Sequence, residues 1–208
     1  MGNGNKAEML IAVCAVITSA IAVFIAWDQG RVMRGQQHGA VYPVVQVDGF
    51  VSSGAETSSM GMRISNSGVG PALIERVSLL RDGKPIDSLA AYVEEIPSGY
   101  AHSWSSLIGR AIAPGDAVEP LRVDWSRDAV TPDQLNSAAQ LWSELDVEIC
   151  YCSVFERCWV TRSLGMGSAM TRAERVNRCE RSKSDIFEEV ADQARAPAIE
   201  TEPTPEVE

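Results

Sequence analysis

The residues best suited to chemistry are cysteines, and three of them lie close together in the stretch EICYCSVFERCW. Cys150, Cys152 and Cys158 fall within nine residues, and Cys179 follows further along the chain. Structural zinc sites usually space two ligands as Cys-x₂₋₄-Cys, whereas these pairs are Cys-x-Cys and Cys-x₅-Cys. The redox motif Cys-x-x-Cys is absent from the sequence. This spacing leaves three alternatives open: disulfide bonds, reduced cysteines packed in the protein, and a metal or redox site.

The cysteine stretch alternates as two strands around a short turn at 154–156. In this register Cys152 lies opposite Cys158, at a Cα separation of ~4.5–5.5 Å that a disulfide can bridge. Cys150 and Cys179 are left as a second pair, provided that the segment around Cys179 folds back over the same face. The alternation predicts a core face with Val147, Ile149, Tyr151 and Trp159, and an opposite face with Glu148, Cys150, Cys152, Cys158, Val160 and Arg162.

Serine, histidine and acidic residues are present, but they form no catalytic signature. His102 stands beside serines in GYAHSWSS, and neighbours in a strand point to opposite faces, so adjacency does not make a dyad. The sequence contains no nucleophile elbow, P-loop, dinucleotide-binding glycine motif or His-Glu-x-x-His. The acidic pairs Glu94-Glu95 and Glu188-Glu189 are typical of exposed helix charges. We therefore expect a protein without catalytic residues, cofactor or resident metal, and a hydrolase that uses His102 is a third-ranked alternative.

The N-terminal region contains an uncharged apolar run of nineteen residues, from Met9 to Trp27. At ~1.5 Å per residue, a helix of this length spans roughly the ~30 Å hydrocarbon core of a bilayer. Trp27 ends the run, where an aromatic ring suits the interface. A core helix of this length usually keeps a polar face, and a signal peptide wants a shorter run and a cleavage site after it. The run predicts an uncleaved single-span anchor in the bilayer.

Two features of the predicted span bear on assembly and orientation. The small residues Ala15/Ser19 and Ala22/Ala26 repeat at four-residue spacing, which allows close approach of two helices and hence a homo-oligomer. The basic residues flanking the span are nearly balanced and lean towards a cytoplasmic C-terminal domain. The even number of cysteines outside the span favours an oxidising compartment instead. We give the cysteines more weight and expect a periplasmic or external domain.

Composition and patterning divide the rest of the chain. A net charge of −10 argues against a nucleic-acid partner, because phosphate contacts need clustered Lys and Arg. The fold class expected is mainly β with minor α: a transmembrane helix followed by a β-sandwich with one or two peripheral helices. The expected segments are a short tail at 1–8, the membrane helix at 9–27, a juxtamembrane connector at 28–40, the sandwich at 41–165, a charged helical segment at 166–194, and a disordered acidic tail at 195–208.

Turn residues between apolar strands give the most informative pattern in the predicted sandwich. Alternation over 60–65 breaks at Asn66-Ser-Gly-Val-Gly-Pro, resumes over 72–80, and is followed by a hairpin signal at Asp82-Gly83. The turn motif therefore comprises Asn66, Gly68, Gly70, Pro71, Asp82 and Gly83. This order resembles immunoglobulin-like sandwich modules of bacterial surface and envelope proteins. The whole chain also resembles uncharacterised bacterial proteins that carry one N-terminal anchor and a small β domain, a likeness that implies a fold and brings no catalytic residue with it.

Two helices outside the membrane can be predicted from end signals and periodicity. A short helix is expected at 88–96, and a longer one begins after Thr131, whose capping box includes Pro132 and Gln134. The apolar face of the longer helix comprises Leu135, Ala138, Ala139 and Trp142, which fall at helical spacing. We expect this face to pack on a sheet.

The function expected from these features is binding or scaffolding by a membrane-tethered β-sandwich of the bacterial inner membrane. Its sheet edges or loops would recognise a protein partner that the sequence does not name. The alternative is a thiol- or metal-dependent membrane sensor that uses Cys150, Cys152, Cys158 and Cys179.

Overall fold

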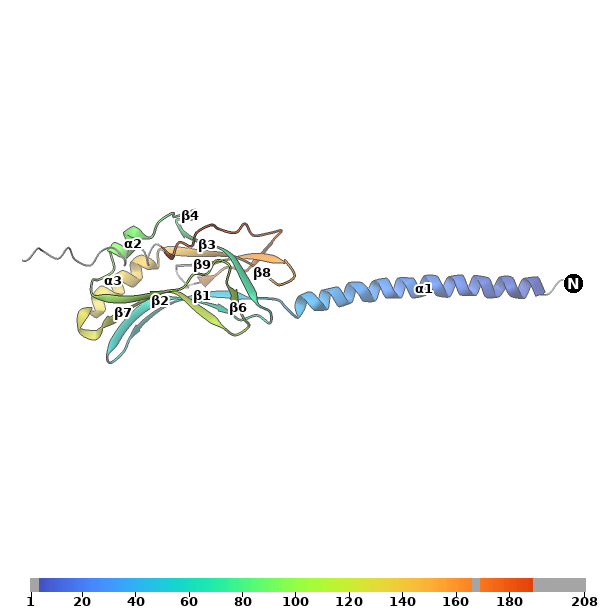
Figure 1. Cartoon of the computed structure of the whole chain (residues 1–208), viewed down its shortest axis with the longest axis horizontal. Coiled ribbons are helices and arrows are strands. Elements are labelled where there is room, and N and C mark those ends of the chain that lie inside the picture. The colour runs from blue at the N-terminus through green and yellow to red at the C-terminus, as the bar shows by residue number, and fades with distance from the viewer. Residues whose placement is uncertain (1–3, 166–168, 189–208) are drawn as a thin grey trace, which may run out of the picture. The chain divides into compact units, whose positions relative to one another are not determined.

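The computed structural model describes residues 4–165 and 169–188 of the chain. The chain divides into two compact units, Met1–Val41 and Tyr42–Glu208, and each is described by itself (Figure 1). The predicted acidic tail at 195–208 lies outside the described residues, so that prediction stays untested.

The first unit is a single helix, α1, which spans Gly4–Gly39. It contains the predicted membrane span from Met9 to Trp27 and continues through most of the segment predicted as a connector. None of its most apolar window is buried against protein, and its length and composition would allow it to cross a membrane. An N-terminal signal sequence has the same properties, so anchoring stays a prediction at this point.

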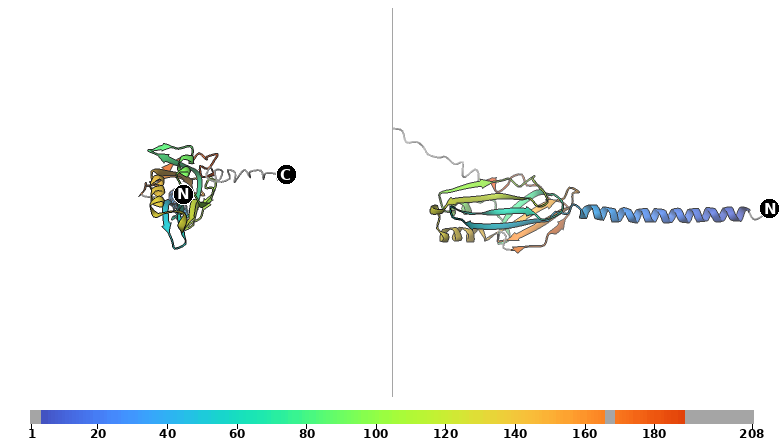
Figure 2. Two further views of the ribbon diagram at one scale, coloured as in Figure 1. Left: turned by 90° about the vertical axis from the view of Figure 1, so that its left-hand side faces the viewer. Right: turned by 90° about the horizontal axis from the view of Figure 1, so that it is seen from below.

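The second unit is mainly β and contains two antiparallel sheets, which lie face to face (Figure 2). The first sheet has the strand order β1-β2-β7-β5. Its strands are β1 (Val45–Ser53), β2 (Thr57–Asn66), β7 (Ala117–Ser126) and β5 (Tyr100–Trp104). The composition of SSGAETSS, residues 52–59, favours a flexible loop, but most of these residues are strand because β1 and β2 continue their pairing as far as Ser53 and Ser58. The hairpin turn is correspondingly short.

The second sheet has the main order β10-β9-β8-β3-β4, with β11 beside β9 and β6 beside β3. Its strands are β3 (Ala72–Arg81), β4 (Lys84–Pro85), β6 (Ala111–Ile112), β8 (Leu145–Cys152), β9 (Cys158–Leu164), β10 (Ala169–Met170) and β11 (Glu174–Val176). Asp82 and Gly83 both have positive φ between β3 and β4, which confirms the predicted hairpin turn.

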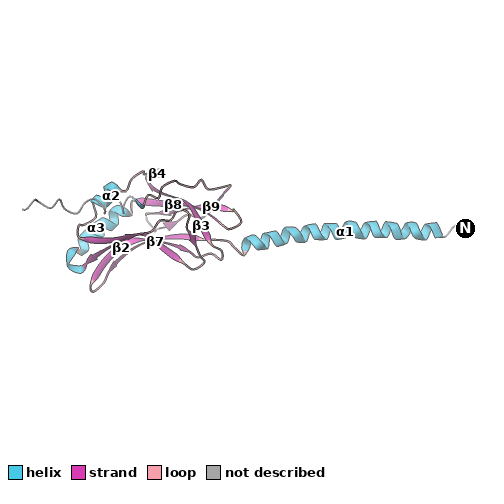
Figure 3. Ribbon diagram, viewed as in Figure 1, coloured by secondary structure: helices cyan, strands magenta, loops and turns pink. Residues whose placement is uncertain are grey.

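Short helical elements accompany the sheets (Figure 3). They are α2 (Ala90–Glu94), the 3₁₀ turn η1 (Arg127–Ala129) and α3 (Pro132–Trp142). The capping box at Thr131 and Gln134 is formed as predicted, and Pro132 occupies the first turn of α3. Leu135, Ala138 and Trp142 are buried, so α3 packs by its predicted apolar face.

The predicted charged helix at 166–194 is wrong for residues 169–187, whereas Glu188, the last described residue, is helical. From Ala169 to Phe187 the chain forms β10, β11 and irregular segments instead of a helix. The physical reason lies in the partners: Glu174, Arg175 and Val176 pair with β9, and Cys179 is held by a disulfide. Edge pairing and a covalent link outweigh the weak helical preference of a sequence with a thin apolar stripe.

Both sheets contribute to one apolar core. Period-two alternation directs Val47, Met62, Ile64 and Leu121 of the first sheet inwards, and all are essentially buried. The second sheet meets them with Ile74, Leu79, Val147, Ile149 and Tyr151. This arrangement is a sandwich-like pair of sheets, and the sequence-based expectation of such an architecture is met at that level.

Asn66 organises the turn between β2 and β3. Its Oδ1 accepts hydrogen bonds from the amides of Val44 and Gly68, at 3.1 and 3.0 Å. Its Nδ2 donates to the carbonyls of Gly70 and Ile112, at 2.8 and 2.9 Å. Because the side chain is almost wholly buried, the four backbone groups have no solvent to replace it. The predicted turn residue is therefore a buried link between several loops.

Replacing Asn66 with Asp should destabilise the domain by about 3 kcal/mol or more, since two backbone carbonyls lose their donor and face a carboxylate. Chemical denaturation of the full-length protein in detergent, followed by tryptophan fluorescence, measures the change. Ser67→Ala is the matched control, because Ser67 is exposed and its hydroxyl bonds only the side chain of Gln46. Equal stability of the Asn66→Asp variant and the wild type would contradict the assigned role.

Candidate functional site

The cysteine hairpin adopts the predicted register. Tyr151 pairs with Trp159 and Cys152 with Cys158, while Cys150 lies opposite Val160. Strand alternation therefore places Tyr151 and Trp159 towards the core and the cysteines on the other face of the sheet. The predicted register is confirmed from the pair Val147–Ser163 to the pair Cys152–Cys158.

Two disulfides form on this outer face. Cys152 and Cys158 are joined directly across the hairpin, with a Cα–Cα distance of 4.0 Å. Cys150 is joined to Cys179 at a Cα–Cα distance of 5.7 Å, which closes a separation of 29 residues. These are the two pairs expected from the register, although a strand and an irregular segment, and not a helix, bring Cys179 into place. Cys14 is the free cysteine among the described residues.

The segment that carries Cys179 is held at neighbouring points as well. Arg181 makes a two-pronged ion pair with Glu75, with N–O distances of 2.6 and 2.9 Å, and the amide of Ser182 donates to the carbonyl of Glu75. The hydrogen bond to Glu75 and its negative charge raise the pKa of Arg181. This segment is thus fixed to β3 on one side of Cys179 and to β9 through β11 on the other.

The two disulfides lie next to one another. The Sγ atoms of Cys152, Cys158 and Cys179 are all within 4.8 Å of one another. Cys152 and Cys158 are buried and Cys179 is half-buried. Sulfur atoms at these separations can exchange partners if a thiolate is generated, because exchange requires attack of a thiolate on a neighbouring disulfide. In the oxidised state these sulfur atoms are bonded to one another in disulfides, so they are not the anionic thiolates that bind zinc.

The structure does not assemble the other predicted chemical residues into a reactive site. His102 lies on β5 opposite Val123, and its ring contacts that of Tyr100 at 6.1 Å. Among the described residues, no hydrogen bond or ion pair joins His102 to a serine or an acid. Glu94 and Glu95 are exposed in and just after α2, and Glu188 is exposed near the end of the described chain. The proposal that His102 serves a hydrolase has no geometric support.

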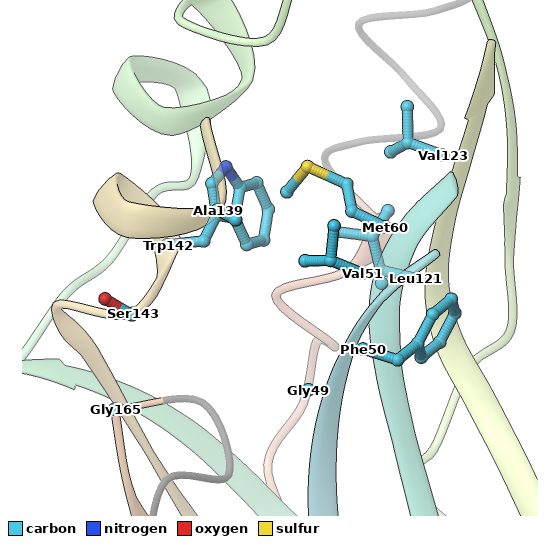
Figure 4. Close-up of a pocket in the computed structure, with 11 residues that line it drawn as sticks. Gly49, Phe50, Val51, Met60, Leu121, Val123, Ala139, Trp142, Ser143 and Gly165 are labelled. Atoms are coloured by element: carbon cyan, nitrogen blue, oxygen red, sulfur yellow. The ribbon is translucent and has the colours of Figure 1, made fainter. Parts of the chain in front are cut away.

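An apolar pocket of about 270 Å³ opens between the first sheet and the C-terminal end of α3 (Figure 4). On the sheet side it is lined by β1, β2 and β7; on the other side by the end of α3 and by Gly165, just after β9. The lining residues are Gly49, Phe50, Val51, Met60, Gly61, Leu121, Val123, Ala139, Trp142, Ser143 and Gly165. In Figure 4, Val51 and Met60 point towards Trp142, whereas the ring of Phe50 points away from the pocket.

The geometry of β1 explains the opening. Val45 and Val47 point inwards and are buried, but further along the same face come Gly49, without a side chain, and Val51, which is 49% exposed. Phe50 belongs to the outer face, where its ring lies against Arg122. At this end of β1 the inner face is therefore apolar and incompletely covered.

The side chains that line the pocket offer almost no free polar groups. The Nε1 of Trp142 donates to the carbonyl of Tyr92, and the hydroxyl of Ser143 donates to the carbonyl of Gln140, so the polar atoms of both side chains are engaged within the domain. The remaining lining side chains end in carbon or, for Met60, in a thioether. No titratable side chain is among the residues that line it. The pocket is suited to apolar groups, which bind by removing surface from water.

Sequence reasoning missed this pocket. Ala139 and Trp142 were assigned to the core-facing side of their helix, and Trp142 is indeed buried. The stretch AVYPVVQVDGFV, residues 40–51, alternates well enough to predict a strand, and Val51 at its end carries no other signal. What the sequence does not show is that the small residues Gly49, Ala139 and Gly165 come together from three separate elements and leave a space between them.

Comparison of the chain with protein-family models and with curated proteins finds no match. The features that bear on function are the geometry of the cysteine cluster, the pocket and the apolar helix α1.

Removing the disulfides should destabilise the domain unequally. Loop-closure entropy predicts a loss of about 3.5 kcal/mol for the Cys150→Ser/Cys179→Ser pair and about 2 kcal/mol for the Cys152→Ser/Cys158→Ser pair, because the first closes a longer loop. Denaturant unfolding of the full-length protein in detergent measures both.

A thiol count of the unfolded, unreduced wild type is the control. It should give one reactive thiol per chain, that of Cys14. A count of five would show that the bridges are absent in solution and would remove the basis of the comparison.

Proposed function

We propose that the protein is a membrane-tethered, non-catalytic binding module of the bacterial envelope, and that its apolar pocket receives part of a protein partner. In this proposal α1 crosses the inner membrane once, and the β domain, of immunoglobulin-like type, lies on the periplasmic side. The pocket is the observation that carries the proposal.

The properties of α1 support tethering. The segment from Glu8 to Gly39 has a mean hydropathy of 2.7 in its most apolar window and buries none of that window against the protein. Exposed side chains such as Ile11, Val16 and Phe24 would leave a large apolar surface in water, which a bilayer removes. The ring of Trp27 and the guanidinium of Arg31, 5.4 Å apart, suit the interface at the end of the run.

The disulfides support a location outside the cytoplasm. Thioredoxin and glutathione keep cytosolic thiols reduced, whereas disulfides persist in the bacterial periplasm and outside the cell. All four cysteines of the β domain are paired. The basic residues that flank the span weakly favour a cytoplasmic β domain instead. We give the two disulfides more weight, because the difference in flanking charge is small.

The pocket supports binding as the activity of the domain. It offers an apolar surface that includes the half-exposed Val51 at its mouth and the buried Met60 and Trp142 at its sides. A folded domain gains stability by filling such a space, so an open pocket with satisfied polar neighbours fits a site that an external group fills. The absence of titratable side chains from its lining fits recognition better than acid–base chemistry.

A second candidate function is a thiol-dependent sensor. The observation in its favour is the proximity of the Sγ atoms of Cys152, Cys158 and Cys179, within 4.8 Å of one another. Reduction of either bridge would place a thiolate beside the remaining disulfide. The half-buried position of Cys179 would give a reductant its point of access.

Filling the pocket should strongly weaken partner binding. The Ala139→Phe variant places a ring in the space beside Trp142, and we expect at least a roughly tenfold loss of the partner complex, as a factor of ten in affinity is about 1.4 kcal/mol. The complex is measured on native gels after mild detergent extraction of membranes from the native host, with the wild type running above the size of the chain alone.

Ser137→Phe is the matched control, since Ser137 is exposed and lies on the side of the same helix that faces away from Ala139 and the pocket. The thermal unfolding of both variants should stay close to that of the wild type. Persistence of the complex in folded Ala139→Phe, or a wild type that runs alone, would contradict the proposal.

A further inference from the structure

The strand β1 forms one edge of the first sheet. It pairs with β2, and among the described residues it has no second strand partner. An edge strand presents backbone groups that no neighbour in its sheet can satisfy. The pocket opens beside this edge, because Gly49 and Val51 belong both to the edge and to the pocket lining.

The hydrogen-bond pattern shows which backbone groups point away from β2. The amide of Ser67 donates to the carbonyl of Val44, and the amide of Gly54 donates to that of Thr57. In an antiparallel ladder, residues that bond to the neighbouring strand alternate with residues whose backbone points the other way. Even-numbered residues of β1 therefore bond to β2. The odd-numbered residues Gly49, Val51 and Ser53 direct their amides and carbonyls to the free side.

The free part of the edge is limited to the second half of β1. Val45 and Val47 are 2% and 0% exposed and are covered by the rest of the domain. Gly49, Val51 and Ser53 are exposed. The side chains of odd-numbered residues also point to the inner face, so the outward backbone groups and the mouth of the pocket coincide over these three residues.

This combination selects one class of occupant. A lipid chain or a small apolar molecule can fill the pocket but offers nothing to the backbone groups of Gly49 and Val51. A helix has already used its own backbone groups. An extended peptide provides both, because it adds hydrogen bonds along an edge and projects alternate side chains to one face. Gly49 places no side chain between such a strand and the pocket.

We propose that an extended segment of the protein partner adds to the free edge of β1 at Gly49–Ser53 and places an apolar side chain in the pocket beside Trp142. The added strand runs antiparallel to β1, like every other strand pair of the two sheets. This inference rests on the proposed function and deepens it, since it names the form in which the partner is recognised. In antiparallel pairing, the residues that bond to Gly49 and Val51 carry the side chains that face the pocket.

A defined peptide tests this inference. The probe is a capped, fluorescent octapeptide with valine or leucine at alternate positions and threonine or lysine between them. The full-length protein in lipid nanodiscs should bind it saturably below ~1 mM, measured by fluorescence anisotropy. Hydrogen exchange should show new protection at 49–53 and no change at the distant turn 82–83.

Substitutions in the protein separate the two parts of the contact. Val51→Pro removes an outward amide that β2 does not use, and should reduce peptide affinity at least roughly tenfold. Val51→Ala keeps the amide and should weaken binding less. Ala139→Phe blocks the pocket and should abolish binding. Unfolding temperatures show whether each variant is folded.

Methylated peptides give a test that does not depend on the folding of a variant. Methylating the amides of the valine and leucine residues should abolish binding, whereas methylating those of the intervening residues should leave it within roughly twofold. Strand addition would be overturned if neither set of methylated peptides lost affinity, or if both sets lost it equally. Absence of saturable binding to the wild type would overturn it as well.

The outcomes distinguish this inference from the proposed function. A native partner complex that Ala139→Phe disrupts, together with failure of the peptide tests, would leave the binding module in place and reject strand addition. Displacement of the peptide by a second copy of the chain would also reject a partner segment as occupant. It would be seen as a dimer cross-linked through the introduced thiols of a Val51→Cys variant. Equal peptide binding before and after removal of residues 189–208 is expected; a gain on removal would assign the edge to the tail of the chain.

Discussion

The two sheets of the β domain bury one core between them, and a strand can offer only alternate side chains to that core. This constraint determines the rest of the domain. It commits Val47, Met62 and Ile149 to the interior and leaves the residues between them for the outer faces. The cysteines of β8 and β9 lie on an outer face for this reason, and the pocket lies on an inner one. The two candidate sites are therefore separated by the sheet itself.

The disulfides extend this arrangement to a part of the chain that could not hold its position by apolar packing alone. Cys179 lies in a mostly polar segment whose neighbours Arg178, Glu180 and Arg181 are charged. The bridge to Cys150 and the ion pair between Arg181 and Glu75 fix this segment across the second sheet. Beyond it, Asp185 accepts a hydrogen bond from the amide of Leu107, and Phe187 is fully buried. A covalent link thus helps to deliver an aromatic side chain to the core from the far end of the domain.

The pocket is a place where the same core is left incomplete. Small residues meet there from β1, α3 and the end of β9, while Met60, Leu121, Val123 and Trp142 around them are buried. Protein interiors normally pack to the density of organic crystals, so a pocket of about 270 Å³ has room for an apolar group from another molecule. In the described part of the chain the backbone groups of Gly49 and Val51 beside it have no strand partner, which is why we propose an extended peptide as its occupant. A tether in the membrane would raise the local concentration of such a partner in the same envelope.

The sequence by itself determined the features that depend on local pattern. The apolar run from Met9 to Trp27, the capping box at Thr131, the turn at Asp82-Gly83 and the hairpin register that pairs Cys152 with Cys158 all follow from spacing over a few residues. Short-range rules of capping, alternation and turn geometry are sufficient for these predictions. The sequence also indicated that Asn66 belongs to a turn, although not that its side chain bonds four backbone groups from three segments of the chain.

Tertiary structure decided whatever depends on contacts between distant segments. Residues 169–187 form strands and irregular structure because β9 and Cys150 supply partners that a helix prediction cannot include. The pocket exists because Gly49, Ala139 and Gly165, far apart in the sequence, meet at one place, and the omission of a side chain leaves no periodic signal. The free side of β1 was likewise decided by the order of strands in the sheet. Alternation shows which side chains face inwards, but only the assembled sheet shows which strand lies at its edge.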